Sequence, residues 1–278
     1  MSVRLRDALM AQLGELRYEP IDKRIRATLG DATVLDSTRA LLVWEPKRVV
    51  PTYAVPSEDI AGEVAASQGG GDKAGDEAAA RDLQLDGRPV WDPSIPFSVR
   101  TTEGEPMTIR AAGAARDAAA FKPADPALNG YVIVDFDAFD AWYEEDELNL
   151  GHPRDPFHRI DIVHSSRHVQ VARDGDVLAE SSSACLLFES PLPVRYYLPR
   201  EDVRMDLLRP SEKKSFCAYK GQASYLSLEG VADIAWSYPE PLREAAEVAG
   251  RIAFLNEETD IAVDGKALER PVTPWSRR

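Results

Sequence analysis

The stretch VLDSTRALLVWE, residues 34–45, recurs later in the chain as VLAESSSACLLFE, residues 177–189, with one residue inserted. A second match follows each stretch, YAVPSEDI at 53–60 and YYLPREDV at 196–203. Similar segments repeated in the same order indicate a duplicated structural unit. We therefore predict two tandem domains.

The two copies differ in length between their matching points. Pro56 and Pro199 are 143 positions apart, whereas Gly130 and Gly250 are 120 positions apart, so the first copy carries extra chain. Residues 61–82, AGEVAASQGGGDKAGDEAAARD, account for that excess. This stretch is rich in glycine, alanine and acids and has too few apolar residues to form a core, which predicts a flexible surface insertion.

The resulting domain plan has four parts. We expect an N-terminal amphipathic helix at 1–19, the diverged first copy at 20–148, a linker at 149–159 and the second copy at 160–278. Both copies should be compact and mainly β, with one short helix each. In the second copy the stretch 239–250, with prolines at its start and a glycine at its end, predicts that helix.

Strand signals are clearest in the second copy. Residues 168–172 alternate in polarity, 173–176 form an Arg-Asp-Gly-Asp turn and 177–179 resume the alternation, which is typical of a β-hairpin. Further strands are expected at 186–189, 195–198, 223–228, 252–255 and 260–263.

Composition excludes several classes of protein. The chain has 278 residues and a formal net charge of −14, which argues against nucleic-acid binding because phosphate neutralisation needs a basic face. No apolar run is long enough for a membrane span, and the N-terminus lacks a signal-peptide core. The only cysteines, Cys185 and Cys217, cannot make a disulfide framework. We expect a soluble, cytoplasmic protein.

The second copy carries four motifs in series: Tyr-Leu-Pro-Arg-Glu-Asp-Val at 197–203, Cys217-x-x-Lys220-Gly221, Ala-Trp-Ser-Tyr-Pro-Glu-Pro at 235–241, and Gly250 after an Ala-rich stretch. With these motifs the second copy resembles the "domain of unknown function 427" family over residues 165–265, and the first copy resembles a diverged member. The resemblance implies a compact fold of the β-tent type and no established activity.

The family also carries a nucleotidyltransferase label. Enzymes of that kind need carboxylates that hold Mg²⁺. Asp135 and Asp137 have the spacing that would place both on one strand face. No glycine-serine loop precedes them, and an acidic strand end is the alternative interpretation.

A comparison of the copies suggests where a site lies. Ser98 falls opposite Cys217, and Thr101 and Thr102 fall opposite Lys220 and Gly221. Residues found only in the second copy are candidates for ligand binding, together with nearby arginines: Lys220, Gly221, Trp236, Tyr238, Arg200 and Arg204. Aromatic walls with a cation suit a planar, anionic or carbonyl-bearing small molecule.

Cysteine chemistry is a second possibility. Lys220 could lower the pKa of Cys217 and make it a catalytic nucleophile, although a lining thiol is the simpler interpretation. A histidine partner for Cys217 would come from His158, His164 or His168, whereas Cys185, within an apolar run, is expected in the core.

The four histidines, with His152 the first, are spaced by six, six and four residues, which fits no zinc pattern. We predict neither a metal nor a cofactor, and we expect the two copies to pack against each other.

Three functions remain open, and the residues do not decide whether the chain is an enzyme. The favoured one is a small-molecule or nucleotide-binding module with its pocket in the second domain. The alternatives are a cysteine-dependent or nucleotidyltransferase-like enzyme and a protein-interaction scaffold.

Overall fold

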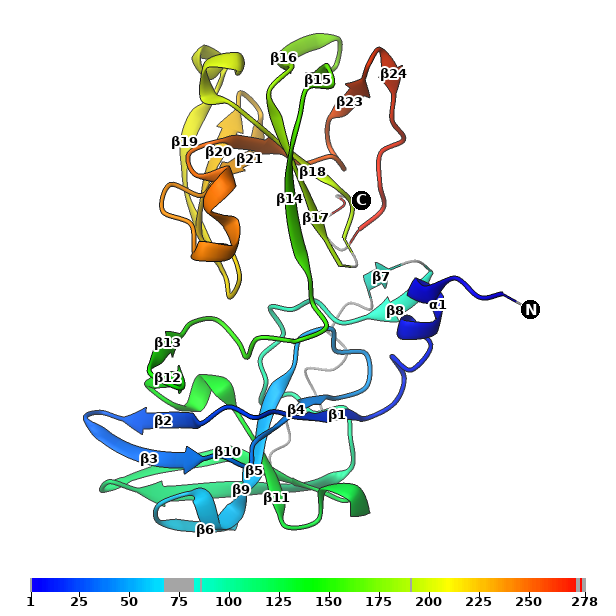
Figure 1. Ribbon diagram of the computed structural model, residues 1–278. Coiled ribbons are helices and arrows are strands. Elements are labelled where there is room, and N and C mark those ends of the chain that lie inside the picture. The colour runs from blue at the N-terminus through cyan, green and yellow to red at the C-terminus, as the bar shows by residue number, and fades with distance from the viewer. Residues whose placement is uncertain (1, 68–82, 86, 191, 274–275, 277–278) are drawn as a thin grey trace. The chain divides into compact units, whose positions relative to one another are not determined.

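The computed structural model describes residues 2–67, 83–85, 87–190, 192–273 and 276 (Figure 1). The chain divides into unit 1, Met1–Asp155, and unit 2, Pro156–Arg278. Of the predicted flexible insertion, residues 68–82 lie outside the described part.

Unit 2 consists of two antiparallel sheets that enclose an apolar core. The seven-stranded sheet has, in spatial order, β14 (Ile160–Ser165), β17 (Ala184–Glu189), β18 (Arg195–Leu198), β22 (Ile252–Phe254), β21 (Val231–Ser237), β20 (Gly221–Leu228) and β19 (Arg209–Cys217). The four-stranded sheet has β16 (Asp176–Ser181), β15 (Val169–Arg173), β23 (Asp260–Val263) and β24 (Lys266–Ala267). Buried side chains from both sheets, such as Val169, Ile234 and Ile252, form the core.

Unit 1 has the same strand order in both sheets. Its seven-stranded sheet has β1 (Arg17–Pro20), β4 (Leu41–Trp44), β5 (Thr52–Pro56), β11 (Tyr131–Val134), β10 (Ala114–Pro123), β9 (Gly104–Ala111) and β6 (Glu63–Ala66). Its four-stranded sheet has β3 (Ala32–Ser37), β2 (Ile25–Leu29), β12 (Ala141–Glu144) and β13 (Glu147–Asn149). A two-stranded ribbon, β7 (Leu83–Leu85) with β8 (Arg88–Val90), forms a separate small sheet.

Equivalent contacts recur at the predicted repeat. Leu35 bridges to Ile60 in unit 1, and Ala179 bridges to Val203 in unit 2. Each bridge follows a 3₁₀ turn that begins directly after a proline, η1 (Ser57–Asp59) after Pro56 and η5 (Arg200–Asp202) after Pro199. The sequence matches therefore fall on corresponding positions of the two sheets.

The predicted hairpin in unit 2 is confirmed. β15 pairs with β16 through a turn in which Asp174 and Gly175 have φ values of 52° and 92°. Successive left-handed residues characterise the tight turns that fit strand twist.

Three local predictions were wrong. The N-terminal helix is only α1 (Leu5–Met10), because residues 17–20 pair with β4 instead. Residues 63–66, expected in the flexible insertion, form β6.

The third concerns the helix expected at 239–250, which is the 3₁₀ segment η7 (Arg243–Val248). Two prolines restrict the preceding chain and Leu242 offers no capping side chain, so too few residues remain to nucleate an α-helix. Ala245, at φ −117°, interrupts even this short segment.

The outer face of the seven-stranded sheet in unit 2 carries a second apolar cluster. Cys185, Tyr197 and Trp236 belong to it, and Ala245 and Val248 of η7 cover it. No helix in the described ranges is long and apolar enough to cross a membrane.

Candidate functional site

A buried carboxylate lies at the end of β17. Cys185, Leu187 and Glu189 occupy alternate positions of this strand and so point to the same outer face of the sheet. Cys185 and Leu187 contribute to the apolar cluster, whereas Glu189, the next residue on this face, carries a carboxylate. Its side chain is only 7% exposed, so its partners decide whether the ionised form is tolerated.

Glu189 has two such partners. The Lys220 ammonium donates a hydrogen bond to one carboxylate oxygen, and the other oxygen lies 3.0 Å from His158 Nε2. Burial would raise the pKa of Glu189, but Lys220 and His158 overcome that effect and lower it to about 2. The pKa of Lys220 is raised, because the attraction of Glu189 outweighs the burial that would lower it. This pair is therefore ionised at neutral pH.

Lys220 lies in the tight turn of the β19–β20 hairpin. Cys217 is paired with Gly221 across it, and the Lys220 carbonyl accepts from the backbone of Leu242. Gly221 has φ +90°, and a Cβ there would approach Leu242 N to 3.3 Å. A glycine permits both this backbone conformation and the close approach.

Aromatic side chains stand beside the pair. Trp236 Nε1 donates to the Tyr197 hydroxyl at 3.0 Å, and the Tyr197 and Tyr238 rings lie 6.4 Å apart. Burial raises the pKa of Tyr197 to about 12 and raises that of Tyr238 further. Both phenols therefore keep their protons at neutral pH and can act as hydrogen-bond donors.

Several hydrogen-bond donors at this site carry N–H or O–H groups that make no hydrogen bond among the described residues. Among the described residues, the Lys220 ammonium bonds to Glu189 alone although it carries three N–H groups, and the Tyr238 hydroxyl has no hydrogen-bond partner. The Cys217 thiol is half-buried, and its charge would affect the pKa of both Lys220 and Tyr238. We call Lys220, Cys217, Tyr197 and Tyr238 the donor cluster. It could receive a carbonyl, carboxylate or phosphate oxygen.

The structure thus brings together Lys220, Cys217 and Tyr238, with Gly221 in the turn. Trp236 joins them through its hydrogen bond to Tyr197.

The predicted arginines lie elsewhere in unit 2. Arg200 begins η5, and the exposed Arg204 forms an ion pair with Asp206 at 2.7 Å. The Arg204 backbone bonds to Leu178 of β16, on the side of the four-stranded sheet.

The histidines do not serve Cys217. His158 bonds to Glu189, and His168 Nε2 lies 2.7 Å from Glu180. His164 contacts the other thiol, with its Nδ1 3.3 Å from Cys185 Sγ. His152 Nδ1 lies 2.7 Å from the carbonyl of Pro153.

Unit 1 also buries a carboxylate at the corresponding strand end. Glu45 directly follows β4, is 1% exposed and accepts from Arg100 Nη1 at 3.1 Å and from Thr101 N at 3.1 Å. Arg100 therefore supplies the cation that Lys220 supplies in unit 2, one residue before the predicted match Thr101. The match of Ser98 with Cys217 was wrong, because the sheet position of β19 belongs to β6.

Three matching positions of this face are apolar in unit 1. Ala54 lies at the position of Tyr197, Phe121 at that of Trp236 and Pro123 at that of Tyr238, as the strand registers show. The Arg100 guanidinium lies 5.1 Å from the centre of the Phe121 ring. The buried ion pair is thus present in both units, whereas the phenols are found in unit 2.

Sequence reasoning missed Glu189 and Tyr197, and it considered His158 as a partner of Cys217 rather than of Glu189. A signal for the carboxylate was present, because both copies of the opening repeat end in glutamate after an apolar run. An acid shared at the end of two buried strands indicates a buried charge that needs a partner.

The Asp135/Asp137 hypothesis for Mg²⁺ was wrong in its geometry. β11 ends at Val134, and Asp135 caps η4 (Phe136–Ala138) by accepting from Asp137 N at 3.1 Å. The two carboxylates therefore do not share a strand face.

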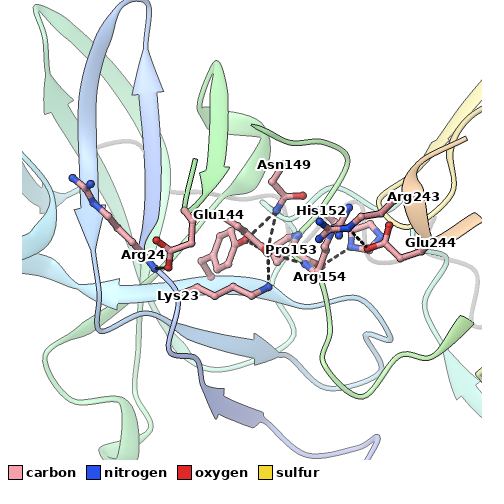
Figure 2. A network of polar contacts seen from close by, with 11 residues as sticks. Lys23, Arg24, Glu144, Asn149, His152, Pro153, Arg154, Arg243 and Glu244 are labelled. Atoms are coloured by element: carbon pink, nitrogen blue, oxygen red, sulfur yellow. Dashed lines mark hydrogen bonds and ion pairs between the residues drawn. The ribbon is translucent and has the colours of Figure 1, made fainter. Parts of the chain in front are cut away.

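A different polar network ties the sheets of unit 1 together (Figure 2). Glu144 accepts from Lys23 at 2.5 Å and from the Tyr53 hydroxyl at 2.7 Å, and Asn149 donates to the same hydroxyl at 3.0 Å. Tyr53 is fully buried and links β5 to β12 and β13. The network connects the two sheets of unit 1, on the face of β5 opposite to Glu45.

The two best-formed surface depressions among the described residues are in unit 1. Residues 122–130 line one, and Gly62 with residues 110–115 lines the other. Neither contains a buried charge or a row of unpartnered donors.

Comparison with known proteins adds one assignment. No curated protein matches the chain. Residues 161–265, which include Cys185, Glu189 and the whole donor cluster, match the model of a family described as "Domain of unknown function (DUF427)".

Proposed function

We propose that this protein binds a small anionic or carbonyl-bearing molecule at the donor cluster of unit 2. The observation that carries the proposal is the buried Lys220 ammonium, which holds unused N–H donors beside Cys217 and Tyr197, with Tyr238 next to Tyr197. A ligand oxygen that accepts from Lys220 would gain a charge-assisted hydrogen bond in a site of low dielectric.

The ligand class follows from charge and shape. Lys220 and Glu189 neutralise each other, so the pair tolerates a carbonyl as well as an anion. The rings of Tyr197, Trp236 and Tyr238 offer apolar surface to a planar group. Keto acids, aromatic carboxylates and nucleotides combine these features.

We also propose that the two units are diverged copies of one β-tent-like domain. Their identical strand orders and the paired positions of Glu45 and Glu189 support this duplication. Unit 1 would then retain the fold and the buried ion pair while lacking the phenols that contact a ligand.

A thermal-shift screen of keto acids, aromatic carboxylates and nucleotides tests the binding proposal, with Tyr238→Phe as the diagnostic variant. The control is Tyr196→Phe, because Tyr196 lies on the same sheet but packs on the opposite, core-facing side. We expect at least one compound to raise Tm in the wild type and in Tyr196→Phe, with most of the shift lost in Tyr238→Phe. Absence of any shift would favour a scaffold, and equal shifts in all three proteins would place the ligand elsewhere; either result overturns the proposal.

A further inference from the structure

A thiol, an imidazole and a carboxylate form a second cluster in unit 2. His164 on β14 lies directly opposite Cys185 on β17, and His164 Nδ1 is 3.3 Å from Cys185 Sγ. His164 Nε2 is 2.9 Å from Glu247 Oε2, on η7. The order thiol, imidazole, carboxylate is the arrangement that activates a cysteine nucleophile.

The contact with Glu247 sets the proton position on the His164 ring. An ionised carboxylate only accepts, so Glu247 holds the hydrogen of His164 on Nε2. The Nδ1 lone pair of the neutral ring then faces the Cys185 thiol and can accept its proton. Glu247 would stabilise the imidazolium that this transfer creates.

The thiol is buried, but the imidazole and the carboxylate of this cluster are largely exposed. Cys185 itself is 0% exposed, whereas the side chains of His164 and Glu247 are 65% and 61% exposed. β14 is the edge strand of its sheet, so the sulfur lies only one strand from the edge. Reaction at the sulfur therefore requires a movement of His164 or of η7 that admits a small reagent.

Charged groups from each neighbouring element influence the thiol. Burial raises the pKa of Cys185, Arg251 after η7 opposes that effect and Glu247 adds to it. The thiol therefore stays protonated at rest, and its reaction depends on a base within reach.

We propose that Cys185 is a base-assisted nucleophile that exchanges with small disulfides. The sulfur attacks one sulfur of the disulfide, the S–H proton moves to His164 Nδ1, and the S–S bond breaks. The departing thiolate takes that proton, so one mixed disulfide and one free thiol form with no net oxidation.

The surroundings of the sulfur favour this chemistry over acyl transfer. The backbone group beside Cys185 Sγ is the carbonyl of Glu247, 3.6 Å away. A carbonyl would repel the oxyanion of an acyl intermediate, which needs hydrogen-bond donors. Disulfide exchange creates no oxyanion and needs only the proton relay.

Unit 1 lacks all three groups at the matching positions. Leu41 occupies the position of Cys185, and Pro20, opposite Leu41, occupies the position of His164. The η3 turn (Pro126–Leu128) contributes the apolar Leu128 to the same face. The cluster is therefore not required to build this sheet.

The test is reaction of the full chain with 2,2′-dithiodipyridine under native conditions. Trypsin separates the two cysteines, since Cys185 lies in the peptide 174–195 and Cys217 in the peptide 215–220. Mass spectrometry of each peptide over time then gives the rate at each thiol. The variants are His164→Gln and Glu247→Gln, and His168→Gln is the matched control, because His168 is also exposed and carboxylate-paired.

We expect Cys185 to react in the folded wild type and in His168→Gln, and to slow by about 100-fold in His164→Gln, as loss of a general base requires. Glu247→Gln should slow it by a smaller factor. An unchanged or faster rate in His164→Gln would mean that His164 only covers the sulfur. That outcome, or labelling of Cys185 only after denaturation, overturns the proposal.

Discussion

Units 1 and 2 have the same sheets in the same order, yet they differ in what lies beside the buried carboxylate. In unit 1, Glu45 is held by Arg100, and the positions that match Tyr197, Trp236 and Tyr238 are apolar. In unit 2, Glu189 is held by Lys220 and His158, and phenols and the Cys217 thiol lie beside the pair.

The comparison separates fold from function. A buried ion pair that persists with a different cation is a feature of the sheet, because an ionised carboxylate at that strand end must be neutralised in either unit. Tyr197, Tyr238, Cys217 and the Cys185–His164 contact have no such architectural need. These groups are therefore the part of unit 2 in which function should be sought.

The largest effect should come from breaking the ion pairs. Lys220→Met leaves Glu189 buried with His158 as its remaining partner, and Arg100→Met leaves Glu45 without its cation. Each should lower the free energy of unfolding by about 3–5 kcal/mol, measured by urea denaturation.

The double variant Glu189→Gln/Lys220→Met should recover much of the loss. A cost below about 1 kcal/mol for either single variant would contradict a shared structural role, since exposed pairs contribute about that much.

A second ion pair distinguishes unit 2 from unit 1. Arg195 binds Glu257 through two hydrogen bonds of 2.6 and 2.7 Å, and Thr273 also donates to Glu257. Unit 1 has Thr52 at the position of Arg195. Arg195→Met should cost about 3 kcal/mol in urea denaturation, because the Glu257 side chain is 0% exposed and loses its charged partner. The control is Thr273→Val, which removes only the hydrogen bond from Thr273 to Glu257. If Arg195→Met lowers the free energy of unfolding by no more than this control, the ion pair is dispensable.

Acid should weaken unit 2 through Glu189. Its folded pKa of about 2 lies below the ordinary 4.5, so its contribution is present above pH 4.5 and is lost as pH falls toward 2. About 2 kcal/mol should be lost by pH 3. The measurement is urea denaturation from pH 7 to pH 3, and the Glu189→Gln/Lys220→Met variant should lose less stability over that range. Equal losses in both proteins would contradict the assignment.

The smallest effect should come from the hairpin glycine. Gly221→Ala places a Cβ at φ +90° and 3.3 Å from Leu242 N, whereas Gly175→Ala has φ +92° and open space. Thermal denaturation should show a loss of about 1–2 kcal/mol for each from the backbone conformation, with the greater loss at Gly221. Equal losses would mean that the contact with Leu242 adjusts freely.

Much of the fold was predictable from the sequence because strand alternation and the repeat are local patterns. The matches at Pro56/Pro199 and Gly130/Gly250 fell at the ends of corresponding strands, and the 173–176 turn was predicted correctly. The short length of η7 and the formation of strand β6 depend on contacts with distant parts of the chain, which local patterns do not encode.

The site was predictable only in part. Lys220, Cys217 and Tyr238 were predicted because they belong to the sequence motifs at 217–221 and 235–241. Glu189 and His158 come from β17 and from the segment before β14, outside those motifs. The pairing of His164 with Cys185 depends on strand register, which places residues 21 positions apart side by side.

The central claim is that unit 2 alone carries the ligand site, and hydrogen–deuterium exchange tests it most directly. The experiment compares the full chain with and without the compound that gives the largest thermal shift. We predict slower exchange at 217–222 and 236–242, around the donor cluster, with no change at 99–103 and 121–125, the matching parts of unit 1. Protection in unit 1, or in both units alike, would contradict the account.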